Sequence, residues 1–94
     1  MEPELKRKWV DALRSGKFER GNGRLKADSK YCCLGVLRHI ANPRDKRRAA
    51  HAHLLHSDQL AEFGLSNSEQ TKLADMNDNG KTFSEIADYI EKRI

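Results

Sequence analysis

The stretch DMNDNGKTFSEI carries oxygen-bearing side chains at the spacing of a calcium-binding loop. Asp75, Asn77 and Asn79 fill the first, third and fifth positions of such a loop, and Gly80 fills its turn. The twelfth position should supply a bidentate Glu, but it is occupied by Ile86. A loop without its closing carboxylate matches the calcium motif weakly, so we predict no metal here.

The same stretch is better explained as the junction between two helices. Glu85 lies three residues after Thr82, and this spacing is typical of a capping box at a helix start. Ser66 and Glu69 repeat the pattern upstream. We therefore predict helices over residues 66–78 and 82–94, joined at Asn79-Gly80, where the backbone needs unusual angles.

A second interpretation of these two helices is a helix-turn-helix DNA-binding motif. The last helix would then be the recognition helix, and its exposed positions would include Glu85, Asp88 and Glu91. Carboxylates at these positions would repel DNA phosphates, so we reject this reading.

Histidines and cysteines offer little catalytic chemistry. His51, His53 and His56 are close in sequence, but no Cys or carboxylate stands beside them at zinc-site spacing. Cys32 and Cys33 are adjacent, which is neither the spacing of a redox dithiol nor an easy geometry for a disulfide. We expect Cys33 in the core and Cys32 to be more accessible. The sequence thus predicts no catalytic residue, no metal and no cofactor, hence a protein that is not an enzyme.

Positive charge is concentrated in the first half of the chain. Residues 1–50 contain 14 Lys or Arg against 6 Asp or Glu, while residues 51–94 contain 4 against 8. Such asymmetry favours an electrostatically steered partner or self-complementary packing. The residues predicted to bind the partner are Arg44, Lys46, Arg47 and Arg48, joined by Lys6, Arg7 and Arg14, with Lys8 nearby, on one basic face.

Apolar periodicity predicts a mainly α fold, a compact single domain of four or five helices spanning residues 1–94. Beyond the two helices above, we expect helices over residues 3–15 and 30–41, with Asp28 or Ser29 capping the second. Gly35 inside that helix indicates a close helix–helix crossing. The remaining expected elements are a small β-hairpin or structured loop over residues 17–27 around Asn22-Gly23, a helix or loop over residues 44–56, and a short helix from a Ser57 cap to Gly64.

No apolar run is long enough to cross a bilayer, and the N-terminus lacks an apolar signal core. We therefore expect a cytoplasmic protein that does not engage membranes.

Several segments together are similar to a known group of proteins. They are WVDALRSGKF from Trp9, YCCLGVL from Tyr31, LADMND from Leu73 and FSEIADYI from Phe83. As a set they resemble a family of small, mostly uncharacterised proteins encoded by bacteriophages and prophages, whereas residues 44–53 fit that pattern least. The resemblance implies a protein that binds and inhibits or redirects a host protein or nucleoprotein complex, including a defence system. Nucleic-acid binding through the basic face is the alternative, and a small-ligand sponge, in which an oligomer encloses a basic pocket, is a further one. The oligomeric state is not predicted.

Overall fold

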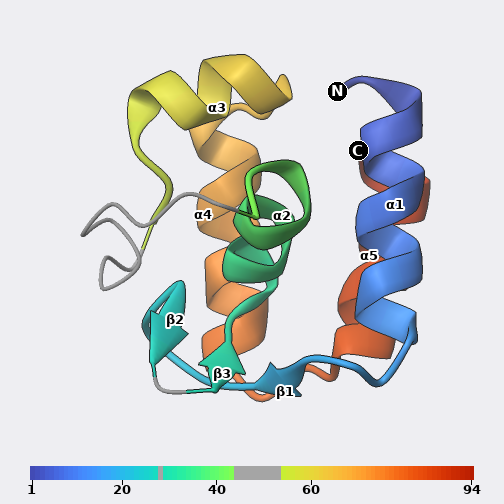
Figure 1. Ribbon diagram of the computed structural model, residues 1–94, viewed down its shortest axis with the longest axis vertical. Coiled ribbons are helices and arrows are strands. Elements are labelled where there is room, and N and C mark those ends of the chain that lie inside the picture. Colours follow the sequence, from blue (N-terminus) through green and yellow to red (C-terminus); the bar gives the residue numbers. More distant parts are fainter. Residues whose placement is uncertain (28, 44–53) are drawn as a thin grey trace.

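The computed structural model describes residues 1–27, 29–43 and 54–94 of the chain. Within them the chain forms five helices and one small three-stranded sheet, so the predicted mainly α fold is confirmed (Figure 1). The helices are α1 (Pro3–Arg14), α2 (Cys33–Ala41), α3 (Ser57–Phe63), α4 (Asn67–Asp78) and α5 (Phe83–Arg93). The strands are β1 (Glu19–Arg20), β2 (Lys26–Ala27) and β3 (Lys30–Tyr31).

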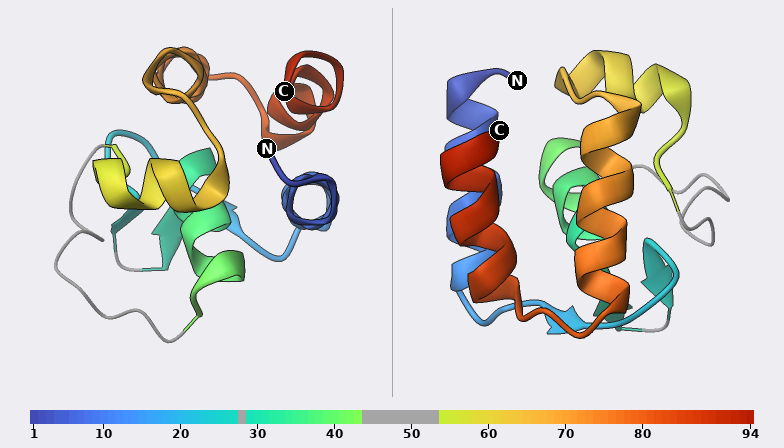
Figure 2. Two further views of the ribbon diagram at one scale, coloured as in Figure 1. Left: turned by 90° about the horizontal axis from the view of Figure 1, so that it is seen from above. Right: turned by 180° about the vertical axis from the view of Figure 1, so that it is seen from behind.

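Four of the helices surround one core. Helices α1, α5, α4 and α2 follow one another around it, and α3 lies across one end (Figure 2). The first and last helices run antiparallel side by side, which places both ends of the chain at the end of the molecule opposite the sheet (Figure 1). No described helix is both long enough and apolar enough to span a bilayer.

The helix starts follow the local sequence. The Glu2 carboxylate accepts hydrogen bonds from the backbone N–H groups of Glu4 and Leu5, and Pro3 occupies the first position of α1. Both predicted capping boxes form, at the starts of α4 and α5. Each one pairs two otherwise unbonded N–H groups reciprocally, which is why these two helices were the most predictable part of the chain.

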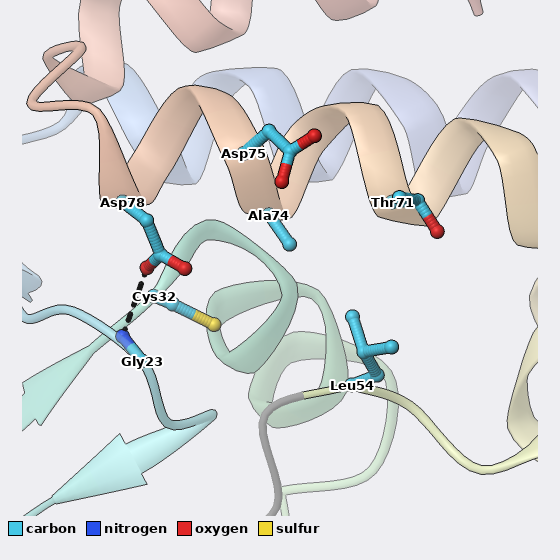
Figure 3. A pocket seen from close by; sticks show the side chains of 7 residues that line it. All are labelled: Gly23, Cys32, Leu54, Thr71, Ala74, Asp75 and Asp78. Carbon is cyan, nitrogen blue, oxygen red and sulfur yellow. Dashed lines mark hydrogen bonds between the residues drawn. The ribbon is translucent and has the colours of Figure 1, made fainter.

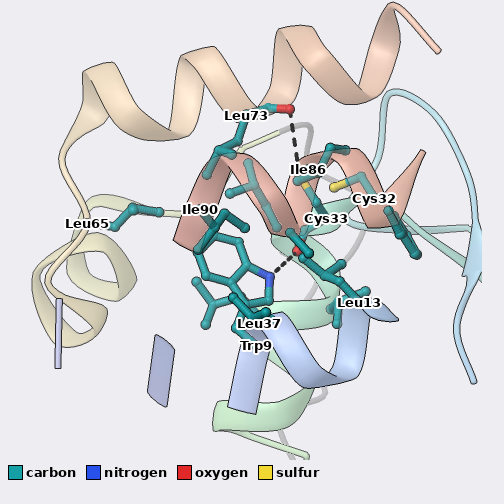
Figure 4. Packing of buried hydrophobic residues seen from close by; sticks show 14 of the residues in the cluster. Trp9, Leu13, Cys32, Cys33, Leu37, Leu65, Leu73, Ile86 and Ile90 are labelled. Carbon is teal, nitrogen blue, oxygen red and sulfur yellow. Dashed lines mark hydrogen bonds between the residues drawn. The ribbon is translucent and has the colours of Figure 1, made fainter. Parts of the chain in front are cut away.

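Trp9 and Cys33 lie at the centre of the core (Figure 4). The indole Nε1–H of Trp9 donates to the carbonyl oxygen of Cys33 at 2.9 Å, and the Cys33 thiol lies 3.6 Å from the carbonyl oxygen of Leu73. The surrounding side chains, including Leu37, Ile86, Ile90 and Leu34, are fully buried. Each such aliphatic side chain contributes about 1.5–3 kcal/mol by its burial.

The small sheet differs from the predicted hairpin. Strand β3 lies between β1 and β2, parallel to β1 and antiparallel to β2. The strands on either side of Asn22-Gly23 therefore do not pair with each other, and the antiparallel pair is formed one step later, by Lys26–Ala27 with Lys30–Tyr31. Residues 30 and 31 are thus a strand rather than the first turn of the predicted helix over 30–41.

Helix α2 starts at Cys33, with Cys32 as its N-cap, so the expected caps were wrong: Ser29 is not the cap, and Asp28 lies outside the described residues. The Cys32 side chain makes no capping hydrogen bond. Instead, the backbone N–H of Cys33 donates to the side-chain oxygen of Asn77 in α4, at 3.1 Å. A cap supplied from a distant helix leaves no local sequence signal.

Gly35 makes a close approach, but to a different partner from the one expected. A Cβ atom at this position would lie 1.7 Å from the carbonyl oxygen of Leu25, in the segment that leads into β2. The missing side chain therefore accommodates the backbone beside the sheet, not a helix–helix crossing.

The expected helix or loop over residues 44–56 falls largely outside the described residues. Its last three residues are not helical, and helix α3 starts at Ser57 with His56 as the N-cap, one residue before the predicted cap. Gly64 ends α3 in the left-handed conformation, φ 72°, as predicted for its C-terminus.

Candidate functional site

The cations of α1 that we predicted to bind a partner are partly engaged within the protein. Arg14 donates to Asp88 at 2.6 Å and to Glu91 at 2.8 Å, and these carboxylates raise the pKa of its guanidinium. The ammonium of Lys6 donates to the backbone oxygen of Glu91 at 3.2 Å. Lys6 and Arg14 therefore hold α1 against α5.

Arg7 is exposed and forms no ion pair or hydrogen bond with the described residues. Together with Lys6 and the buried Val10 it lines a groove of about 290 Å³. Asp11 and Glu91 also line this groove, so its charges balance. The structure thus brings Lys6 and Arg7 together in one groove. The four cations at Arg44, Lys46, Arg47 and Arg48 lie outside the described residues, and their place on a common basic face stays a prediction.

A second surface, at the sheet, was not anticipated from the sequence. Phe18, Tyr31 and His39 come from the segment before β1, from β3 and from α2, and their rings meet edge to face. The ring centroids are 5.1 to 5.6 Å apart, and all three side chains are half-buried. The ammonium of Lys26 lies 5.5 Å from the centroid of Tyr31. We call these four residues the aromatic–lysine surface.

Positive charge predominates in the chain around this surface. Residues 17–31 contain five Lys or Arg and two Asp or Glu. Lys17, Arg24, Lys26 and Lys30 are exposed, and among the described residues only Lys30 has a nearby carboxylate, that of Glu19 at 3.9 Å. The sequence signal was weak, since the segment contains only two aromatic residues, Phe18 and Tyr31, each directly preceded by Lys. It was obscured because His39, the third ring, comes from a different element.

A cavity of about 210 Å³ lies between α4 and the segment that joins β1 to β2 (Figure 3). The sulfur of Cys32 points into this space, and the side chains of Ala74 and Leu54 form an apolar part of its wall (Figure 3). Asp75 and Asp78 provide carboxylates, and Asp78 also accepts a hydrogen bond from the backbone N–H of Gly23 at 3.0 Å. The described residues that line the cavity are Gly23, Cys32, Leu54, Thr71, Ala74, Asp75 and Asp78.

Neither thiol is poised for nucleophilic chemistry. Burial raises the pKa of the Cys32 thiol, and raises that of Cys33 further. The thiolate is the reactive form, so both groups are weak nucleophiles at neutral pH. Our expectation that Cys33 lies in the core is confirmed, and Cys32 is the more accessible of the two, although it is only 4% exposed and both residues are buried.

The residues that fill the first positions of the apparent calcium loop lie in α4 and at its C-cap. Asn77 is fully buried, and its side-chain amide donates to the carbonyl oxygen of Gly21 at 2.7 Å while its oxygen caps α2. Asp75 belongs to α4 and lines the cavity. Within the described ranges no three His, Cys, Asp or Glu side chains converge as a metal site. Of the three histidines considered for zinc, His51 and His53 lie outside those ranges, and His56 caps α3 by accepting from the N–H of Asp58.

A domain of unknown function, DUF8296, matches residues 1–59, which is more than half of the chain. The protein belongs to the DUF8296 family. No curated protein and no solved structure matches the chain.

The DUF8296 match covers α1, the sheet and α2, and ends within α3. It therefore includes the whole aromatic–lysine surface and also Cys32 and Leu54 of the cavity. The two cavity carboxylates, Asp75 and Asp78, come from α4, beyond the matched DUF8296 residues. The aromatic–lysine surface is thus built entirely from the family segment, while the cavity combines that segment with α4.

Proposed function

We propose that this DUF8296 protein is a non-enzymatic binding protein of phage type that binds a host protein or complex and inhibits or redirects it, as an anti-defence inhibitor does. The observation that supports this function is the aromatic–lysine surface, where three rings from separate elements gather beside exposed cations. Aromatic side chains are enriched at the energetically dominant centres of protein interfaces. Surrounding cations raise association rates with an oppositely charged partner.

The geometry of the rings favours a protein partner over a nucleic acid. Phe18, Tyr31 and His39 pack edge to face against one another, and Lys26 lies over Tyr31. Single-stranded nucleic acids bind to aromatic side chains by stacking on open ring faces. Rings whose faces are already contacted by the edge of a neighbouring ring or by an ammonium group offer mainly edges and apolar area, which suit protein side chains better.

Nucleic-acid binding remains the second candidate. It is favoured by the excess of cations in residues 17–31 and by the predicted contribution of the basic cluster at residues 44–48. Phosphate contacts of this kind would be sequence-independent and strongly dependent on salt.

Affinity capture from host lysate tests the proposed function. The tagged protein is compared with Lys26→Glu/Lys30→Glu, which reverses two charges at the sheet, and with Lys72→Glu/Lys92→Glu, which reverses two exposed charges on α4 and α5. We expect one host protein to be retained after nuclease treatment by the wild type and by the α4/α5 variant, and lost by the sheet variant. Capture that disappears with nuclease would support the nucleic-acid candidate instead. Equal capture by both charge variants would remove the aromatic–lysine surface from the proposal.

A further inference from the structure

The cavity beneath α4 has the size and chemistry of a small-molecule site. Its volume is about 210 Å³. An engineered apolar cavity of about 150 Å³ in another protein holds one benzene molecule. The present cavity therefore has room for a single ring or a short alkyl chain with one polar substituent.

The walls of the cavity divide into an apolar part and an acidic part. Cys32, Ala74 and Leu54 form the apolar part, and the sulfur of Cys32 points into the space (Figure 3). Cys32 is only 4% exposed, and its thiol donates no hydrogen bond to the described residues. Leu54 is 37% exposed, which leaves a large apolar side chain beside the cavity that a ligand would cover.

The acidic part is formed by Asp75 and Asp78. Among the residues that the structure describes, the lining contains these two carboxylates and no Lys or Arg. Asp75 is exposed and forms no ion pair with the described residues, whereas Asp78 is fixed by its hydrogen bond to Gly23. Asp78 also adds to the effect of burial in raising the pKa of the Cys32 thiol. A ligand with an apolar body and a positive charge would therefore complement both parts.

We propose that this cavity binds a small organic cation, an alkyl- or arylammonium, with its apolar body against Cys32, Ala74 and Leu54 and its ammonium group at Asp75 and Asp78. This site is separate from the aromatic–lysine surface and independent of the proposed protein partner. Its ligand is opposite in charge to the one that a basic, sponge-like pocket would hold.

Titration with benzylamine and with benzyl alcohol, followed through the backbone amide signals of Gly23, Ala74 and Asp75, tests the charge preference directly. The two probes share their ring and differ in charge at neutral pH. We expect saturable shifts with benzylamine and at least about tenfold weaker binding of benzyl alcohol, since one charged contact of this kind is worth about that factor. The variant Asp75→Asn/Asp78→Asn keeps the acceptor for Gly23 and should bind both probes equally weakly. Absence of saturable shifts with benzylamine, or equal affinity for the two probes in the wild type, would overturn the proposal.

Labelling of Cys32 provides an independent measurement on the folded protein. Thiosulfonate reagents that carry either a trimethylammonium or a sulfonate group transfer their thiol portion to the cysteine sulfur, forming a disulfide and releasing a sulfinate. We expect the cationic reagent to react faster at Cys32 than the anionic reagent, because the negative field of the two carboxylates concentrates cations. The ratio of the two reaction rates should fall severalfold in Asp75→Asn/Asp78→Asn. Benzylamine should slow the cationic reagent in the wild type. Peptide mapping distinguishes Cys32 from Cys33, and a ratio unchanged by the double variant would contradict the site.

Discussion

The side chain of Asn77 caps a helix to which it does not belong. Its oxygen accepts the backbone N–H of Cys33, the first residue of α2, at 3.1 Å, while its amide nitrogen donates to the carbonyl oxygen of Gly21 at 2.7 Å. In addition, Arg20 donates to the backbone oxygen of Asn77 at 2.8 Å. One fully buried amide in α4 thus links the start of α2 with the segment after β1.

Replacing Asn77 should therefore destabilise the protein although no apolar contact is lost. Asn77→Leu leaves the buried Cys33 N–H without a partner, at a cost of about 1–3 kcal/mol, and also removes the donor to the part-buried oxygen of Gly21. Urea unfolding followed by circular dichroism measures the loss. Asn79→Leu, at the exposed C-cap of α4, is the matched control and should change the free energy of unfolding by less than about 1 kcal/mol. Equal effects of the two substitutions would show that the interhelical cap is unimportant.

Gly35→Ala should prevent the native packing of α2 against the sheet. The new Cβ would lie 1.7 Å from the Leu25 carbonyl oxygen, so one of the two backbones must move. Overpacking of this kind costs about 1–3 kcal/mol and sometimes more. Thermal unfolding measures the effect, and Gly80→Ala is the control because nothing lies within 4 Å of its added Cβ and only its positive φ, 86°, opposes the change. A Gly35→Ala protein as stable as the wild type would show that this contact is absent.

The α1 cations should separate into structural and partner-binding residues. Arg14→Ala removes two exposed ion pairs with α5, so we expect only a small loss of stability and little change in captured partner. Arg7→Glu should leave stability nearly unchanged and weaken capture if α1 belongs to the contact surface. Chemical denaturation and the capture assay are read in parallel. Loss of capture in Arg14→Ala with unaltered stability would assign Arg14 to the interface.

The capping carboxylates predict a specific loss of stability in acid. Hydrogen bonds from Thr82 lower the pKa of Glu85, and backbone N–H groups at the start of α1 lower that of Glu2. Because the folded-state pKa is lower than the ordinary value of 4.5, the stabilisation is complete above that pH and is lost as the pH falls through the folded-state value. Glu85→Gln should reduce the fall of Tm with acidification, whereas Asp11→Asn, at an exposed carboxylate that caps no helix, should not. A Glu85→Gln protein whose Tm falls as steeply as that of the wild type would contradict this assignment.

The nucleic-acid candidate makes a quantitative prediction about salt. If the predicted basic cluster binds phosphates, the logarithm of the affinity for a labelled DNA or RNA falls linearly with the logarithm of salt concentration. The triple variant Arg44→Ala/Arg47→Ala/Arg48→Ala should then reduce the slope by about two to three. Fluorescence anisotropy at low and moderate salt measures both quantities. No binding of either nucleic acid at low salt would eliminate this candidate.

Local sequence signals predicted the parts of this fold that depend on local contacts. The two capping boxes, the Pro3 start of α1 and the Gly64 end of α3 each involve residues within one helical turn, so their spacing was sufficient. The pairing of β3 between β1 and β2, and the cap of α2 by Asn77, join residues far apart in sequence. No local pattern encodes them, and two-residue strands are too short to show alternation.

The candidate sites also depend on contacts between residues that are far apart in the sequence. Charge composition identified cations but not their partners, so the pairing of Arg14 with Asp88 and Glu91 could not be anticipated. The aromatic cluster needs α2 to fold back beside β3, and the cavity needs α4 beside Cys32. Both depend on tertiary packing, which the sequence pattern alone does not specify.

The antiparallel pairing of α1 with α5 has a practical consequence for studying this molecule. An affinity handle or a fluorophore fused to either terminus would project away from the strands, so immobilisation by one end should leave the rings and lysines facing the solution (Figure 1). Labels on both termini would sit close together in the native state and separate on denaturation. Energy transfer between such labels would therefore report unfolding without a substitution at either proposed site.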